Sequence, residues 1–171
     1  MSERICLLLD ATDLESGLET TPGYAPGVRV WKVIFLEPTY KYYWEGNRPW
    51  FFRFLAKGFH HVFCTRRVGN VHAVVEWTYG LFDISLDTKD DGITRIALLA
   101  DLFDGTILEV PQRSIPTAST TRFPLLSCVQ ATQHCLGVNK PFIVTPKQLC
   151  DYLVSRPDTR VVKKGKHFNA K

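Results

Sequence analysis

A tight turn between two β-rich segments constrains the fold of this chain more than any other feature of its sequence. Residues 59–67 and 71–79 are rich in β-branched and aromatic residues, and the dipeptide Gly69-Asn70 lies between them. This combination is typical of a β-hairpin. A two-residue turn also fixes which residues of the two strands face each other.

The remaining segments predict a mixed α and β protein. Further strands are expected where apolar residues alternate or run together, at residues 4–9, 28–36, 81–86, 93–99 and 106–110. Two helices are predicted near the C-terminus, because Ser127 and Thr145 are good N-cap residues and each precedes a glutamine by three positions. We therefore expect an α+β fold in which an antiparallel β-sheet packs against the helix that begins at Cys128.

The length and composition suit such a globular fold. The chain has 171 residues, of which 45% are hydrophobic and 22% are charged. A chain of this size can bury a core without metal ions or disulfides. No apolar run approaches the roughly 18 residues of a membrane span, and the N-terminal apolar run is too short for a signal peptide. We expect a soluble, cytoplasmic protein without a membrane-spanning segment.

The positive charge of the chain is concentrated at its C-terminal end. The net charge is +4, but residues 160–171 contain five lysines and arginines and no acid. The rest of the chain is therefore nearly neutral. We expect residues 160–171 to form a solvated basic tail, whose contacts with nucleic acid would be weak because it can neutralise few phosphates.

The cysteines form neither a disulfide pattern nor a zinc pattern. Their number is odd and their spacing is wide, and no Cys-x-x-Cys motif occurs. The five cysteines are Cys6, Cys64, Cys128, Cys135 and Cys150. We therefore expect no disulfide framework, no metal site and no other cofactor.

Cys128 is the cysteine whose predicted surroundings suit chemistry best. It lies in the first turn of a helix, where free backbone N–H groups and the helix dipole stabilise a thiolate. The same N–H groups can bind an oxyanion. The other four cysteines lie within apolar strand or helix faces, where desolvation disfavours a thiolate, and are expected to be core residues. The alternative is that Cys128 is also a buried structural cysteine.

The predicted hairpin offers a base for this thiol. In the two-residue register Phe63 faces Glu76, so His61 and Glu76 are diagonal neighbours on one side of the hairpin. A carboxylate beside an imidazole orients the ring and stabilises its charged form. A register slip of one residue would exchange His61 for His60, and Asp83 is the alternative to Glu76 as the third residue.

A histidine on a strand, a carboxylate on the next strand and a later cysteine that opens a helix resemble the circularly permuted papain-like cysteine hydrolases. This group includes permuted relatives of the NlpC-type peptidases and the lecithin retinol acyltransferase-like enzymes. The matching stretches are Phe59-His60-His61-Val62-Phe63, Val75-Glu76-Trp77 and Ser127-Cys128-Val129-Gln130, followed by Thr145-Pro146 at the start of a further helix. Small phage-encoded proteins of this type are also similar.

The resemblance divides the chain into three parts. Residues 1–57 form an N-terminal extension, residues 58–159 the papain-like core and residues 160–171 the basic tail. The extension contains a predicted strand and an aromatic-rich segment at residues 37–50. This segment is expected either to pack over the edge of the core or to contact a protein partner.

The resemblance implies hydrolysis or acyl transfer by a thiol. Cys128 would attack a carbonyl, His61 would take and return the proton, and Glu76 would orient His61. The implied substrate is a peptide or amide bond, with cell-wall peptide as the first candidate and a lipid acyl group as the second. The alternative is a non-catalytic structural or assembly protein, such as a phage virion component, that retains the scaffold.

Overall fold

The computed structural model describes residues 23–25, 27–36, 59–78, 81–113, 127–166 and 168. In these residues six strands form one antiparallel sheet in the order β4-β3-β2-β1-β5-β6, accompanied by three helices. The strands are β1 (Val30–Leu36), β2 (His61–Val68), β3 (Val71–Thr78), β4 (Leu81–Thr88), β5 (Thr106–Pro111) and β6 (Arg160–Lys163), and the helices are α1 (Lys89–Leu102), α2 (Cys128–Cys135) and α3 (Pro146–Val154). The expected α+β class with an antiparallel sheet is confirmed. The predicted strand at residues 4–9 and the aromatic segment at residues 37–50 lie outside the described residues.

The hairpin between β2 and β3 has the predicted register. Val68 is opposite Val71 and Cys64 is opposite Val75, and Gly69 supplies the positive φ of +59° in the turn. The β2–β3 pairing stops at Cys64–Val75, although both strands continue among the described residues. Beyond this point β2 pairs only with β1, and β3 pairs only with β4. The expected pairing of Phe63 with Glu76 therefore does not form.

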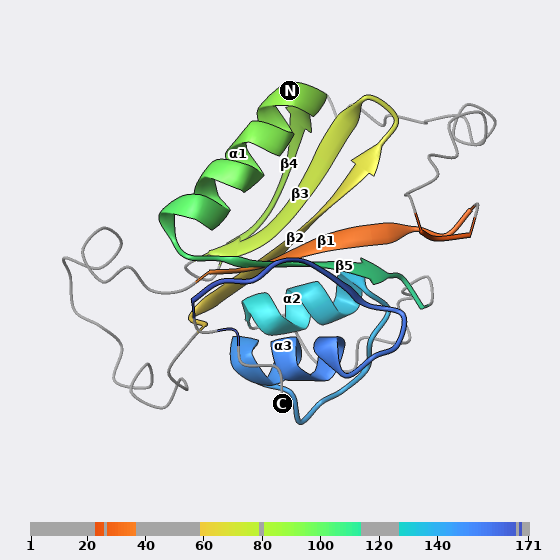
Figure 1. Ribbon diagram of the computed structural model, residues 1–171, viewed down its shortest axis with the longest axis vertical. Helices are drawn as coiled ribbons and strands as arrows, with labels where there is room; N and C mark the ends of the chain where they lie inside the picture. Colours follow the sequence, from red (N-terminus) through yellow and green to blue (C-terminus); the bar gives the residue numbers. More distant parts are fainter. Residues whose placement is uncertain are drawn as a thin grey trace, which may run out of the picture.

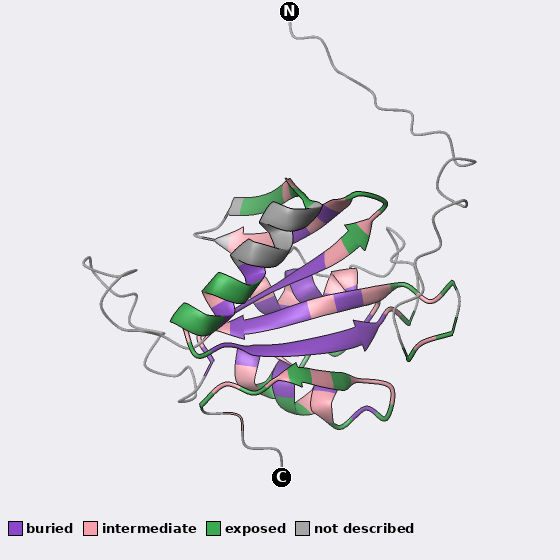
Figure 2. Cartoon of the chain, turned by 45° about the horizontal axis from the view of Figure 1, so that its top comes forward, coloured by how far each residue is buried: buried purple, intermediate pink, exposed green. Residues whose placement is uncertain are grey.

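Helices cover both faces of the sheet (Figure 1). On one face, Ile96 and Ala100 of α1 pack into a core with Ile34 of β1. On the other face, α2 and α3 pack against the sheet, with Val129 and Leu149 in a larger core. The central strands β1 and β5 are consequently buried along most of their length (Figure 2). None of the helices in the described part of the chain is long and apolar enough to cross a membrane.

Residues 93–99 were predicted as a strand, and this prediction is wrong because they belong to α1. Their β-branched and apolar composition suggests a strand, but the burial repeats with a helical period. Ile96 and Ala100 are buried one turn apart, whereas Ala97 and Leu98 between them are exposed. Packing of these two buried residues on the sheet favours a helix over a strand.

The N-caps of α2 and α3 form as expected. The Ser127 side chain accepts a hydrogen bond from the Gln130 N–H at 3.3 Å, and this bond fixes the first turn of α2. Thr145 and Gln148 form a complete capping box at the start of α3. Gly137, just after α2, has φ +64°, the left-handed conformation that ends a helix.

Both ends of the predicted core need correction. Residues 160–163 are not a solvated tail, because they form the edge strand β6 against β5. Lys163 Nζ also donates to the Ala100 carbonyl at 2.8 Å. At the other end, β1 lies between β2 and β5, so this part of the predicted N-terminal extension belongs to the central sheet.

Candidate active site

Cys128 is the first residue of α2, directly after the Ser127 cap. The helix is anchored on the sheet by Val129, which is only 1% exposed, whereas Cys128 itself is half-buried. The first turn of a helix leaves backbone N–H groups without intrahelical partners. The thiol therefore lies where backbone donors and the positive end of the helix dipole can stabilise negative charge.

His61 and Glu76 are joined by a hydrogen bond. The distance from His61 Nε2 to Glu76 Oε1 is 2.9 Å, and the two side chains are 25% and 26% exposed. The His61 ring also stacks on Phe63, with ring centroids 6.3 Å apart. The carboxylate and the aromatic ring together fix the orientation of the imidazole.

Cys128 is close enough to His61 to affect the pKa of its imidazole. Burial alone would lower the pKa of His61, but the interactions with Cys128 and Glu76, including the negative charges of these two groups, raise its pKa from 6.5 to about 9. At neutral pH the imidazole is therefore held in its charged form. A charged imidazole beside a thiol stabilises the thiolate, which is the nucleophilic form of cysteine.

The structure brings together all three residues that the sequence indicated as catalytic: Cys128, His61 and Glu76. Cys128 and His61 are the first residues of α2 and β2, and Glu76 lies near the end of β3. The His61–Glu76 hydrogen bond joins β2 and β3 beyond their last strand pair, Cys64 with Val75. The arrangement of thiol, imidazole and carboxylate is suited to nucleophilic attack with proton transfer.

His60 and Asp83 were the alternatives to His61 and Glu76 as catalytic residues. His60 precedes β2, and its backbone N–H donates to the Leu36 carbonyl at 3.0 Å. Asp83 is on β4, where it is the cross-strand partner of Glu76. The hydrogen bond to His61 comes from Glu76.

The other thiols of the described residues differ in burial and in the direction in which their pKa is shifted. Cys150 is buried in α3, and burial raises its pKa to about 12. Cys64 is buried in β2, and burial likewise raises its pKa well above the usual value. These two behave as the core residues that we expected.

Cys135 meets the expectation only in part. It was predicted to be a core residue, and it packs against the core from a partly buried position. Its interaction with Cys64 nevertheless lowers its pKa, and this effect and the positive charge of Arg66 outweigh its desolvation. The residue is only half-buried. Its partners lie on β2, so this environment depends on how α2 docks on the sheet. No sequence motif indicated it.

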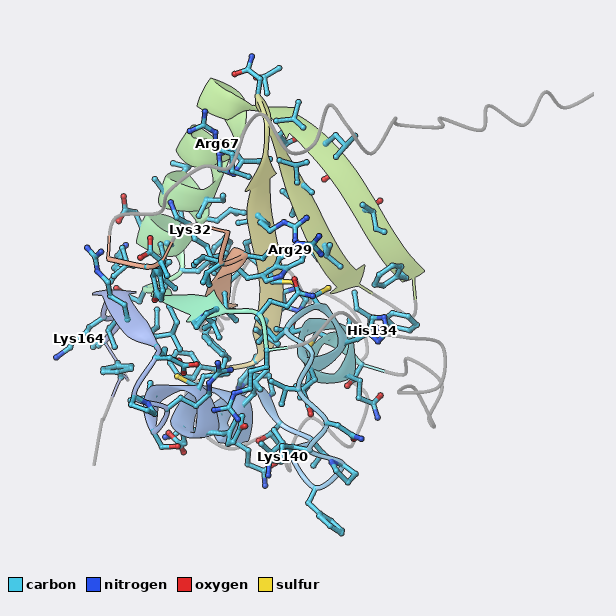
Figure 3. The ribbon with its side chains drawn as sticks, turned by 90° about the vertical axis from the view of Figure 1, so that its right-hand side faces the viewer. Arg29, Lys32, Arg67, His134, Lys140 and Lys164 are labelled. Atoms are coloured by element: carbon cyan, nitrogen blue, oxygen red, sulfur yellow. The ribbon has the colours of Figure 1, made fainter. Side chains whose placement is uncertain are left out.

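Three further features of the described residues were compared with the Cys128 site. These residues contain no group of three or more histidine, cysteine or acidic side chains suited to hold a metal ion. His134 lies in the last turn of α2, at the opposite end of the helix from Cys128, and Figure 3 shows its side chain beside this helix. A surface hollow bordered by Tyr24 and Asp158 shares no residue with the Cys128 site.

No protein-family model, curated protein or solved structure was found to match the chain. What the protein does is therefore inferred from its own side chains.

Proposed function

We propose that the protein is a thiol hydrolase or acyltransferase in which Cys128 is the nucleophile. The observation that carries the proposal is the position of His61 between two groups: its ring is hydrogen-bonded to Glu76 at 2.9 Å, and Cys128 is close enough to raise the pKa of the imidazole. A cysteine activated by a histidine that a third group orients is the usual arrangement for covalent catalysis by a thiol.

In this mechanism the Cys128 thiolate attacks the carbonyl carbon of the substrate, and the carbonyl oxygen becomes an oxyanion. Backbone N–H groups in the first turn of α2 stabilise this charge. His61 gives its proton to the leaving nitrogen or oxygen as the carbon–heteroatom bond breaks, which leaves a thioester on Cys128. His61 then takes a proton from water, the hydroxide attacks the thioester, and the thiolate returns as the acid is released.

The finer fold assignment and the substrate belong to the same proposal. A strand histidine, a carboxylate on the neighbouring strand and a cysteine at a helix start support a circularly permuted papain-like arrangement. This resemblance favours a peptide or amide bond, first of all in cell-wall peptide, over a lipid acyl group.

The test is to trap the acyl-enzyme. The full chain is incubated with the activated ester p-nitrophenyl acetate and, separately, with cell-wall peptides, and intact and peptide masses are recorded after quenching. We expect an acyl adduct on Cys128, together with product release. The Cys128→Ala variant should lose both.

Cys135→Ala is the matched control, because Cys135 is the other half-buried thiol of α2. It should retain acylation and turnover. If acylation survives in Cys128→Ala but disappears in Cys135→Ala, the nucleophile is Cys135 and our assignment of Cys128 is wrong. A wild-type protein that acylates no faster than its own Cys128→Ala variant would favour a scaffold over an enzyme.

A further inference from the structure

Two of the free thiols lie at the interface between α2 and β2. Cys64 is fully buried on β2, and its cross-strand partners Val33 and Val75 belong to the core beneath α2 and α3, so its side chain lies on that face of the sheet. Cys135 is the last residue of α2 and packs against the same core from a half-buried position. One of these two thiols is therefore closed to solvent, and the other is partly open to it.

The two thiols are close enough to influence each other's protonation. Burial raises the pKa of Cys64, and the neighbouring Cys135 raises it further. The interaction with Cys64 in turn lowers the pKa of Cys135. The pair thus combines one sulfur that readily becomes a thiolate with one that stays protonated beside it. In such a pair the first sulfur can be oxidised, and the second can then attack it.

Arg66 brings positive charge to the same interface. It lies two residues after Cys64 on β2, and therefore on the same face of the strand. Its guanidinium lies 5.1 Å from the centre of the Trp31 ring and donates to Gln112 Oε1 at 3.5 Å. Both of these partners are uncharged, and the positive charge of Arg66 helps to lower the pKa of Cys135. A fixed cation beside a partly exposed thiol is the environment of a reactive cysteine.

The remaining thiols of the described residues are poor partners for Cys135. Cys128 begins α2 seven residues earlier, so the helix separates the two backbones by about 10.5 Å. A disulfide requires Cα atoms within about 7 Å of each other. Cys150 is buried in α3, where burial raises its pKa to about 12. Cys64 is therefore the thiol whose position suits a reaction with Cys135.

We propose that Cys135 and Cys64 form a peroxide-sensitive dithiol, in which Cys135 is oxidised first and Cys64 then closes a disulfide between α2 and β2. The Cys135 thiolate attacks one oxygen of hydrogen peroxide, the O–O bond breaks, and hydroxide leaves as a sulfenic acid forms. The Cys64 sulfur then attacks the sulfenic sulfur, and the sulfenic hydroxyl leaves as water with the Cys64 proton. The two sulfurs together lose two electrons, and these reduce the peroxide.

The disulfide would tie the helix that begins with Cys128 to the strand that begins with His61. It would also close a long loop of the chain, and the restriction of the unfolded state by a cross-link grows with loop length. We expect the oxidised protein to melt roughly 5–10 °C above the reduced protein. This stabilisation does not depend on whether Cys128 is a nucleophile.

The test is to titrate the full chain with hydrogen peroxide and to map its peptides by mass spectrometry without reduction. All proteins carry Cys128→Ala, which removes a competing thiol, and circular dichroism verifies that each is folded. We expect a disulfide between Cys64 and Cys135 that dithiothreitol reverses, while Cys150 stays unmodified. Adding Cys64→Ala should leave the sulfenic acid on Cys135, where dimedone traps it. Adding Cys135→Ala should leave Cys64 reduced.

Two neighbouring arginines of β2 provide a matched control. Arg66→Gln should slow oxidation of Cys135 by roughly three- to tenfold, because it removes a charge that favours the thiolate. Arg67→Gln should leave the rate unchanged, because Arg67 lies on the other face of the strand and donates to the Gly69 carbonyl. The proposal is overturned if peroxide yields no disulfide between Cys64 and Cys135 in the folded protein, or if both arginine variants slow oxidation equally.

Discussion

A histidine beside a cysteine becomes a catalytic base only when its ring is held in one orientation. His61 is held by Glu76 on one side and by the stacked Phe63 ring on another, and its pKa responds to the nearby Cys128. His60 is adjacent in sequence but lies before β2 begins. The two histidines should therefore differ sharply in their effect on catalysis.

Replacement of His61 by alanine should lower the rate of Cys128 acylation by about 10²–10⁴-fold, the usual contribution of a positioned base. His60→Ala should leave this rate close to that of the wild type. Both rates are measured with p-nitrophenyl acetate at neutral pH. A severe loss in His60→Ala with full activity in His61→Ala would reverse the assignment of the base.

The contact between His61 and Glu76 was predictable from the sequence only in part. A two-residue turn at Gly69 sets the register as far as Cys64 and Val75, but the two strands stop pairing before they reach His61 and Glu76. The hydrogen bond between these residues therefore also depends on how the ends of the two strands are placed. The environment of Cys135 was not predictable in this way. It arises from contacts with Cys64 and Arg66 across the interface between α2 and β2, and these contacts depend on tertiary packing.

At the scale of elements, the start of α2 positions the thiol, so its cap should matter for reactivity as well as for stability. Ser127→Ala removes the bond to the Gln130 N–H and should lower the free energy of unfolding by about 0.5–2 kcal/mol. It should also slow alkylation of Cys128 by iodoacetamide, because the first turn is no longer held against His61. Denaturant unfolding and mass spectrometry of the labelled peptides measure the two effects.

Thr145→Ala is the matched control, because it removes the equivalent cap of α3. It should lower stability by a similar amount and leave alkylation of Cys128 unchanged. If both variants slow alkylation equally, the effect comes from general destabilisation and not from the position of α2.

The last strand is the second element with a testable role. Deletion of residues 160–171 should lower the free energy of unfolding by at least about 1–3 kcal/mol, the cost of leaving a buried polar group unpaired. The deletion removes the β5–β6 pairing, the bond from Lys163 to Ala100, and Arg160, which lies 3.7 Å from the mostly buried Glu109. Lys166→Ala, which removes an exposed charge after β6, controls for net charge. Equal melting temperatures for the deletion and the wild type would mean that β6 is not part of the stable fold.

Helix α1 shows where local sequence patterns fail at this scale. Its C-terminal half contains β-branched and apolar residues that fit a short strand as well as a helix. Docking on the sheet decides between them, because Ile96 and Ala100 reach the core together only in a helix. Helices α2 and α3, in contrast, carry capping residues that act locally, and both were predictable.

At the scale of the whole molecule, the site couples folding to pH. The pKa of His61 is about 9 in the folded protein and near 6.5 in an unfolded chain, because the interactions with Cys128 and Glu76 outweigh the effect of burial. The folded state therefore binds the proton more tightly. The resulting stabilisation is complete below pH 6.5 and is lost as the pH rises through about 9.

Denaturant unfolding at several pH values measures this coupling. The wild type should lose up to about 3 kcal/mol of unfolding free energy across this window. His61→Ala should lose much less over the same range, while His60→Ala should follow the wild type. A pH dependence that persists unchanged in His61→Ala would assign the coupling to other groups.

The central claim is that Cys128, His61 and Glu76 interact as one unit, and the titration of the His61 ring tests it most directly. NMR spectra of the labelled imidazole are recorded across the pH range for the wild type, Cys128→Ala and Glu76→Gln. We predict that His61 titrates near pH 9 in the wild type and at a lower pH in each variant, because each loses one of the interactions that raise the pKa. A His61 ring that titrates near 6.5 in the wild type, unaffected by either substitution, would contradict the account.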